Sequence, residues 1–185
     1  MARSQKQKAE SRQAILRSAA KLFREKGFDG VTVSDVMDGA GLTHGGFPRH
    51  FSSKEELITA TLADVFAADA RAPSLPSDDL RAFARAYLRK EHRNAPGAGC
   101  VFAALGPEMA RGPEATREVL TEAIERQIDT FASMAGDGDP DARRVAAIGT
   151  WATMIGAMVL ARIAHSDAVS DEILASVRAF LEIDG

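Results

Sequence analysis

The sequence predicts an all-α protein, and three observations support this class. Apolar residues recur at helical spacing along most of the 185 residues. No segment shows the sustained alternation of apolar and polar residues, rich in β-branched side chains, that is typical of strands. Glycine, proline and capping residues separate the helical stretches. With 45% hydrophobic side chains, the chain can bury one core or join a small module to a larger one.

The first two helices are short and lie near the N-terminus. An apolar stripe predicts the first helix, which Gly27 is expected to end. Its members are Ile15, Leu16, Ala19, Leu22 and Phe23. Thr32 is the expected N-cap of the second helix. The positions expected to be buried in that helix are Val33, Val36 and Met37, and Gly39 and Gly41 are expected to close it.

A third short helix is expected in the stretch THGGFPRHF, with Thr43 as its cap. Three short helices joined by glycine turns, the last two only a few residues apart, are the layout of a helix-turn-helix. In that motif the last helix enters the major groove. It needs small or polar residues toward the bases and an apolar side toward the other two helices.

Pro48 interrupts this third helix. If Thr43 is the N-cap, Pro48 is the fifth helical residue, and its missing N–H leaves the His44 carbonyl without a partner at a cost of about 3 kcal/mol. In the alternative, the glycine pair forms an irregular turn and Pro48 becomes the first helical residue, a position that proline favours. Both alternatives predict a distorted or late-starting helix, which we expect still to bind DNA.

A longer helix is expected from Ser53, because Ser53 and Glu56 have the spacing of a capping box. A Pro/Ser loop, RAPSLPSDDL, is expected at its far end. Beyond the loop, the apolar periodicity predicts further helical stretches at 77–93, 100–111, 114–135, 140–165 and 170–183.

The charge is unevenly distributed along the chain. Residues 1–54 carry ten Lys or Arg against five acids, and the rest carry 13 against 21, so a basic end precedes an acidic body. This asymmetry favours contact with a polyanion through the N-terminal part. A solvated basic face without a partner explains the charge equally well.

Residue types that serve catalysis or metal binding are few. The single cysteine, Cys100, excludes an intramolecular disulfide and a cysteine-rich zinc site. A buried spectator thiol is favoured over a sensing thiol. The four histidines have no metal-ligand spacing, so no enzyme, metal or cofactor is expected; they are His44, His50, His92 and His165. The N-terminus lacks the pattern of a signal or transit peptide, so a cytoplasmic protein is expected.

Residues 12–57 closely resemble the TetR family of transcriptional regulators. The resemblance rests on a "GF" turn, T-V-x-D-V, G-L, G-x-F and H-F-x-S-K-E-x-L, all in the family's order. It implies a DNA-binding domain at residues 1–54 and a ligand-binding and dimerisation domain at residues 55–185. It also implies a homodimeric repressor that binds palindromic double-stranded operator DNA under the control of a small effector. At Pro48 the family usually has a tyrosine whose hydroxyl reaches a phosphate.

The residues expected to contact DNA follow from this resemblance and from the groove geometry. They are Thr32, Ser34, Thr43, His44, Gly45, Gly46, Arg49, His50 and Lys54. Each has a simpler explanation that stays open. Thr32 and Thr43 are explained by capping alone, His50 by a structural polar role, and Lys54 by solvation.

The uncharged run at 145–161 predicts a helix–helix interface. It is shorter than the roughly 20 apolar residues of a membrane span, and its small residues allow close approach of another helix, so a partner subunit is favoured over a membrane. Aromatic and methionine residues elsewhere in the body suit either a plain core or an apolar effector pocket. The residues expected to line such a pocket are Phe83, Tyr87, Phe102, Met109, Phe131, Trp151 and Met154.

Overall fold

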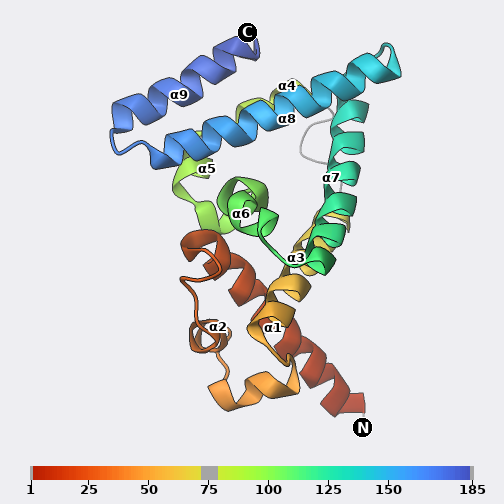
Figure 1. The fold of residues 1–185 in the computed structure, drawn as a ribbon, viewed down its shortest axis with the longest axis vertical. Helices are drawn as coiled ribbons and strands as arrows, with labels where there is room; N and C mark the ends of the chain where they lie inside the picture. Colours follow the sequence, from red (N-terminus) through yellow and green to blue (C-terminus); the bar gives the residue numbers. More distant parts are fainter. Residues whose placement is uncertain (1, 72–78, 184–185) are drawn as a thin grey trace. The chain divides into compact units, whose positions relative to one another are not determined.

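The computed structural model describes residues 2–71 and 79–183, and within these ranges all regular structure is helical (Figure 1). The predicted all-α class is confirmed. The chain divides into two compact units. Unit 1 is Met1–Arg71 with Leu105–Val119, and unit 2 is Ala72–Ala104 with Leu120–Gly185. The DNA-binding part expected at residues 1–54 lies wholly in unit 1.

Unit 1 begins with the elements α1 (Ala2–Lys26), α2 (Val33–Gly39), the 3₁₀ helix η1 (His44–Arg49) and α3 (Lys54–Arg71). Helix α1 starts well before the predicted apolar stripe, because the polar residues ahead of Ile15 continue the helix. It ends as predicted at Gly27, whose φ of 75° lies in the left-handed region that favours glycine.

The core of unit 1 forms where α1 packs against α2 and α3. Its predicted members Ile15, Leu16, Ala19, Phe23, Val36 and Met37 are buried. Leu22 and Val33 are only half-buried, contrary to expectation. Helical periodicity alone therefore places these two residues too deep.

The segment that follows α1 is attached to helix α6 (Val101–Ala110) within unit 1. The Phe28 backbone N–H donates to Oε1 of Glu108 at 3.1 Å. A Cβ at Gly27 would lie 2.7 Å from the same oxygen, but that oxygen ends a flexible side chain that can shift, so it is the dihedral angle that requires glycine here. Glu108 therefore fixes the point where the chain leaves α1.

Helix α3 begins with a variant of the predicted capping box. Ser53 Oγ accepts the Glu56 N–H at 3.1 Å, as expected. The Glu56 carboxylate, however, accepts hydrogen bonds from the N–H and hydroxyl of Ser52, at 2.7 and 2.6 Å, rather than from Ser53. The cap thus uses both serines, which a rule based on a fixed three-residue spacing does not anticipate.

The remaining helices are α4 (Leu80–Tyr87), α5 (Lys90–Asn94), the 3₁₀ helix η2 (Pro96–Ala98), α7 (Glu114–Met134), α8 (Pro140–Ile163) and α9 (Asp167–Phe180). The single helix predicted at 77–93 is wrong, because Leu88 has ψ of 45° and ends α4 before α5 begins. Helix α9 starts at Asp167 rather than at residue 170, after an N-cap at Ser166. Residues 72–78 of the predicted Pro/Ser loop lie outside the described residues.

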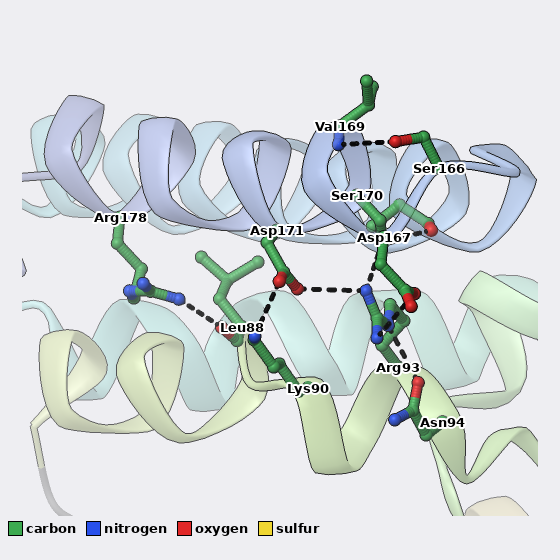
Figure 2. Close-up of polar contacts among 11 residues, drawn as sticks. Leu88, Lys90, Arg93, Asn94, Ser166, Asp167, Val169, Ser170, Asp171 and Arg178 are labelled. Atoms are coloured by element: carbon green, nitrogen blue, oxygen red, sulfur yellow. Dashed lines mark hydrogen bonds and ion pairs between the residues drawn. The ribbon is translucent and has the colours of Figure 1, made fainter.

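Polar contacts join α9 to the segment at residues 88–94 within unit 2 (Figure 2). Asp171 accepts from Lys90 Nζ at 2.6 Å and pairs with Arg93 at 3.1 Å. At the other end of the helix, Arg178 donates to the Leu88 carbonyl at 2.8 Å. The hydrogen bond from Lys90 holds the pKa of Asp171 below its usual value. Helix α9 is thereby held at two points along its length.

Helices α8 and α9 pack against each other and carry large apolar side chains exposed to solvent. On α8 these are Val145, Ile148, Leu160 and Ile163, and on α9 they are Val169 and Phe180. We call these six residues the apolar face. A Cβ added at Gly149 or Gly156 would meet no atom within 4 Å, so the backbone of α8 is open to close approach.

By length and composition α8 is the helix among the described residues that is apolar enough to cross a membrane. A third of its most apolar stretch is buried inside the structure, and core helices of soluble proteins can be equally long and apolar.

Candidate nucleic-acid interface

Helix α2 is fixed by the cap that the sequence predicts at Thr32. Thr32 Oγ1 accepts the Asp35 N–H at 3.1 Å, and the Asp35 carboxylate accepts from the backbone N–H and the hydroxyl of Thr32, at 2.8 and 2.7 Å. These bonds lower the pKa of Asp35, the side-chain bond having the larger effect. The Thr32 hydroxyl is thus engaged in capping α2. Capping alone therefore explains this residue, without a contact to DNA.

The turn between α2 and η1 depends on Gly41. Its φ is 69°, while a Cβ there would meet nothing within 4 Å, so the backbone conformation and not the available space requires glycine. The Leu42 N–H then donates to the Met37 carbonyl at 2.9 Å, which closes the end of α2. This turn directs the chain into η1.

The expected recognition helix is a 3₁₀ helix over His44–Arg49 with Pro48 inside it. Of the two expected outcomes, distortion is observed and a late start is not. Thr43 occupies the N-cap position, but its side chain makes no capping hydrogen bond, contrary to expectation. In 3₁₀ geometry each N–H pairs with the carbonyl three residues back, so Pro48 deprives Gly45 rather than His44 of a partner.

Every residue expected to contact DNA lies at the surface of unit 1. Thr32, Ser34, Thr43, His44, Gly45 and Arg49 are exposed, and Gly46, His50 and Lys54 are half-buried. Phe47 and Phe51 face the other way and are buried, with ring centroids 5.8 Å apart. The segment therefore has the polar outer side and the apolar inner side that a groove-binding element needs.

Positive charge converges around His50. Burial first, and then Lys8, Arg12 and Arg49, lower the pKa of His50. The imidazole is therefore neutral at pH 7, and its Nδ1 is buried without a hydrogen-bond partner among the described residues. Cations near enough to depress the pKa of a neutral imidazole are suited to attract phosphate oxygens.

Lys8 and Arg12 belong to this group of cations, although no sequence motif marks them as DNA contacts. They lie four residues apart and so on one side of α1. The Arg12 guanidinium lies 4.7 Å from the centroid of the Phe51 ring, a cation–π contact that orients it. The i, i+4 spacing was visible in the sequence, but its proximity to His50 depends on tertiary packing.

Replacing Pro48 by tyrosine is expected to tighten binding to all duplexes by several-fold. The change restores a backbone donor and adds a hydroxyl that can reach a phosphate, a hydrogen bond of about 1 kcal/mol net. Salt-matched titrations on a selected and a scrambled duplex measure the effect. Pro48→Ala restores only the donor and so separates the two contributions. No gain with either variant would contradict this role of Pro48.

Six of the seven residues expected to line an effector pocket lie together in unit 2. Phe131 is in ring contact with Phe83 and Trp151, at centroid distances of 5.0 and 6.0 Å. Phe102 contacts Trp151 at 5.1 Å, and Tyr87 contacts Phe83 at 6.0 Å. Met154 is fully buried in the same core.

The seventh residue, Met109, belongs to unit 1 and is buried there. An open cavity of about 490 Å³ lies elsewhere in unit 2, and none of the seven residues lines it. Its lining residues are Asp79, Leu80, Arg81, Ser133, Met134, Ala135, Gly136, Ala146, Thr150, Leu181 and Ile183. The ring contacts show that these aromatic residues pack against one another, so an effector among them requires them to move apart.

Comparisons with known proteins cover both halves of the chain. The family model described as "Bacterial regulatory proteins, tetR family" matches residues 15–61. The model described as "Tetracyclin repressor-like, C-terminal domain" matches residues 76–177, more than half of the chain.

Among curated proteins, the HTH-type transcriptional repressor KstR2 of Mycolicibacterium smegmatis is 38% identical over 58 residues, which are 31% of this chain and 28% of that protein. KstR2 of Mycobacterium tuberculosis is 44% identical over 48 residues, 26% of this chain and 24% of that protein. The matched stretch thus spans about a quarter of these relatives' length.

Solved structures share the whole fold. NemR of E. coli in its reduced form aligns with a TM-score of 0.71 at 22% identity, covering 93% of this chain and 95% of that one. A TetR transcriptional regulator from Chloroflexus aurantiacus aligns with 0.71 at 24% identity, covering 96% of both chains. The two family matches, together with the fold and the helix-turn-helix of unit 1, show that the chain belongs to the TetR family of bacterial regulatory proteins.

Proposed function

We propose that the protein is a repressor that binds a palindromic operator as a homodimer and is controlled by a small apolar effector. The observation that carries the DNA-binding part is the exposed polar outer side of η1 over the buried Phe47 and Phe51, with the Arg12 guanidinium of α1 held against the Phe51 ring. Cationic side chains give sequence-independent attraction to the phosphates, and exposed groups on η1 read base edges. The matching curated relatives named KstR2 are transcriptional repressors, which supports the assignment. Such a regulator acts in the cytoplasm.

Dimerisation through α8 and α9 is supported by the apolar face. Ile163 and Phe180 are 73% and 76% exposed, and leaving such side chains in water is unfavourable. A two-fold contact would cover this face on both subunits with the same residues. Dimerisation would also place the helix-turn-helix motifs of the two subunits about 34–36 Å apart, which is one helical turn of DNA.

Control by an effector is proposed for unit 2. Helix α6 belongs to unit 2 up to Ala104 and to unit 1 from Leu105, and within unit 1 its Glu108 binds the Phe28 N–H. Phe102 lies on this helix. An effector that separates Phe102 from Trp151 would therefore act on the helix whose Glu108 is hydrogen-bonded just beyond the end of α1. It can shift DNA binding only by as much as its affinity differs between the two states of the protein.

A second function is favoured by one observation, the 3₁₀ conformation of η1 around Pro48. A helical dimeric sensor that has weakened or lost DNA binding would tolerate such a distortion. Retention on duplex DNA that falls with added salt distinguishes the repressor from this alternative, since phosphate contacts release counterions.

The proposed roles of Arg49 and Lys54 differ, and their alanine variants test the proposal. Lys54→Ala is expected to weaken binding to all sequences and to reduce the salt dependence by about one unit of slope. Arg49→Ala is expected to cost about 1–3 kcal/mol at particular base pairs and so to relax sequence preference. Fluorescence anisotropy on a selected duplex and its single-base variants measures both.

Arg17, an exposed cation on the same helix as Arg12, provides the matched control. Arg17→Ala removes one charge from unit 1 outside the proposed contact residues and should change affinity by less than either test variant. Equal losses on every duplex for Arg49→Ala and Lys54→Ala would contradict base reading by Arg49.

A further inference from the structure

Arg162, near the end of α8, has a hydrogen-bonding group without a partner. Its Nε and Nη2 donate to the carbonyls of Arg93 and His92, at 3.2 and 2.9 Å, and so cap the end of α5. Its Nη1 is buried and has no acceptor among the described residues. No carboxylate within the described ranges lies at ion-pair distance from Arg162. The acceptors that bind its other two nitrogens are uncharged backbone carbonyls.

Tyr87, at the end of α4, is a second buried donor. The residue is 8% exposed, and its phenol oxygen has no hydrogen-bond partner among the described residues. The ring is held between Phe83 and the edge of His92, whose centroid is 4.3 Å away. Burial, and then the neighbouring Cys100, raise the pKa of Tyr87, so the phenol keeps its proton. An unpaired buried hydroxyl is unfavourable.

Both residues contact His92: the Tyr87 and His92 ring centroids lie 4.3 Å apart, and Arg162 Nη2 donates to the His92 carbonyl at 2.9 Å. Arg162 and Tyr87 each influence the other's pKa, and Cys100 influences both. The segment is held in place because the Cys100 N–H donates to His92 Nε2 at 3.1 Å, while His92 Nδ1 contacts the Tyr87 carbonyl at 2.8 Å. The Cys100 thiol lies near enough to the phenol to raise its pKa, but a thiol is a weak hydrogen-bond partner, so the phenol lacks a strong acceptor.

The chemistry of the missing partner follows from these donors. A guanidinium N–H and a phenol O–H both require an acceptor, and the positive charge favours an anionic one. A carboxylate has two oxygens and can accept from both groups at once. The aromatic side chains of Phe83, Phe102 and Trp151 belong to the same core and provide apolar surroundings for the rest of a ligand.

We propose that Tyr87 Oη and Arg162 Nη1 form a subsite for the carboxylate of a small amphipathic acid, with Cys100 at its edge. This inference rests on the proposal that unit 2 binds an effector, and it specifies the effector's chemical class. The acid's apolar part lies among the aromatic residues of unit 2, and its carboxylate completes the hydrogen bonding of two buried groups.

The test uses hexanoate and its neutral analogue hexanamide as probes of the full-length protein. Cys100 is the single cysteine and Trp151 the single tryptophan, so alkylation by iodoacetamide and intrinsic fluorescence each report on one residue. Hexanoate is expected to slow Cys100 alkylation saturably and to change Trp151 fluorescence with the same midpoint. Hexanamide should need at least about ten times the concentration, because it lacks the charge.

The variant Tyr87→Phe gives a result that a purely structural role would not. Because the hydroxyl has no partner, its removal should leave the melting temperature without ligand unchanged or higher. It should nevertheless weaken hexanoate binding by about tenfold. Arg162→Gln should abolish binding, whereas Arg89→Gln removes an exposed charge from the same region and should have no effect.

The subsite is overturned if hexanoate does not bind, if hexanamide binds equally well, or if Tyr87→Phe binds hexanoate like the unaltered protein. Retention on duplex DNA is measured on the same samples. Hexanoate binding without DNA binding would overturn the proposed repressor function and leave the subsite intact. DNA binding without hexanoate binding would overturn the subsite alone.

Discussion

Replacing Leu160 by glutamate is expected to convert the dimer into monomers and to weaken operator binding by at least about 100-fold. Leu160 is 56% exposed on the apolar face of α8, beside Ile163 at 73%. In a two-fold interface the substitution buries two carboxylates without cationic partners, which costs several kcal/mol. A monomer has one helix-turn-helix, so it loses the affinity that a dimer gains by binding two half-sites together.

Sedimentation velocity at micromolar concentration and titration on a selected palindrome measure the two effects. Ala86→Glu serves as the matched control, because Ala86 is exposed on α4 and is not part of the apolar face. The control should remain dimeric and bind DNA normally. A Leu160→Glu protein that sediments as a dimer would show that another surface joins the subunits.

Phe51→Ala is expected to destabilise unit 1 by about 3–5 kcal/mol and to abolish DNA binding at 37 °C. Phe51 is 2% exposed, its ring centroid lies 5.8 Å from that of Phe47, and the Arg12 guanidinium lies above it. The substitution leaves a cavity behind η1 and removes the contact that orients Arg12. Since small domains have about 5–15 kcal/mol of total stability, the loss is large.

Denaturant unfolding followed by circular dichroism measures the loss of stability. Phe51→Leu keeps most of the buried volume and should cost less than about 1.5 kcal/mol, with DNA binding retained. An alanine variant that unfolds at the same denaturant concentration as the unaltered protein would show that Phe51 does not anchor η1.

Much of the fold could be predicted because its signals are local. The φ of Gly27 and the cap at Thr32 are properties of a few adjacent residues, and both occur where the sequence predicts them. The exposure of Gly45 likewise follows from the pattern of the motif, whereas Gly46 is half-buried near Met37.

What the sequence did not predict depends on contacts between distant residues. The break between α4 and α5 at Leu88 coincides with the carbonyl that Arg178 binds, a partner 90 residues away. The cations around His50 come from both α1 and η1, so their proximity appears only in the folded unit. Likewise, Tyr87 of α4 and Arg162 of α8 both contact His92 of α5 only in the folded unit.

The most direct test of the central claim is a titration of the protein on three duplexes: a palindrome selected from a random pool, a single half-site and a scrambled sequence. Measured at two salt concentrations, the palindrome should bind two protomers, and at least about 10³-fold more tightly than the scrambled duplex. The half-site should bind much more weakly, and all affinities should fall with salt. Equal affinity for the palindrome and the scrambled duplex, or no binding at low salt, would contradict the account.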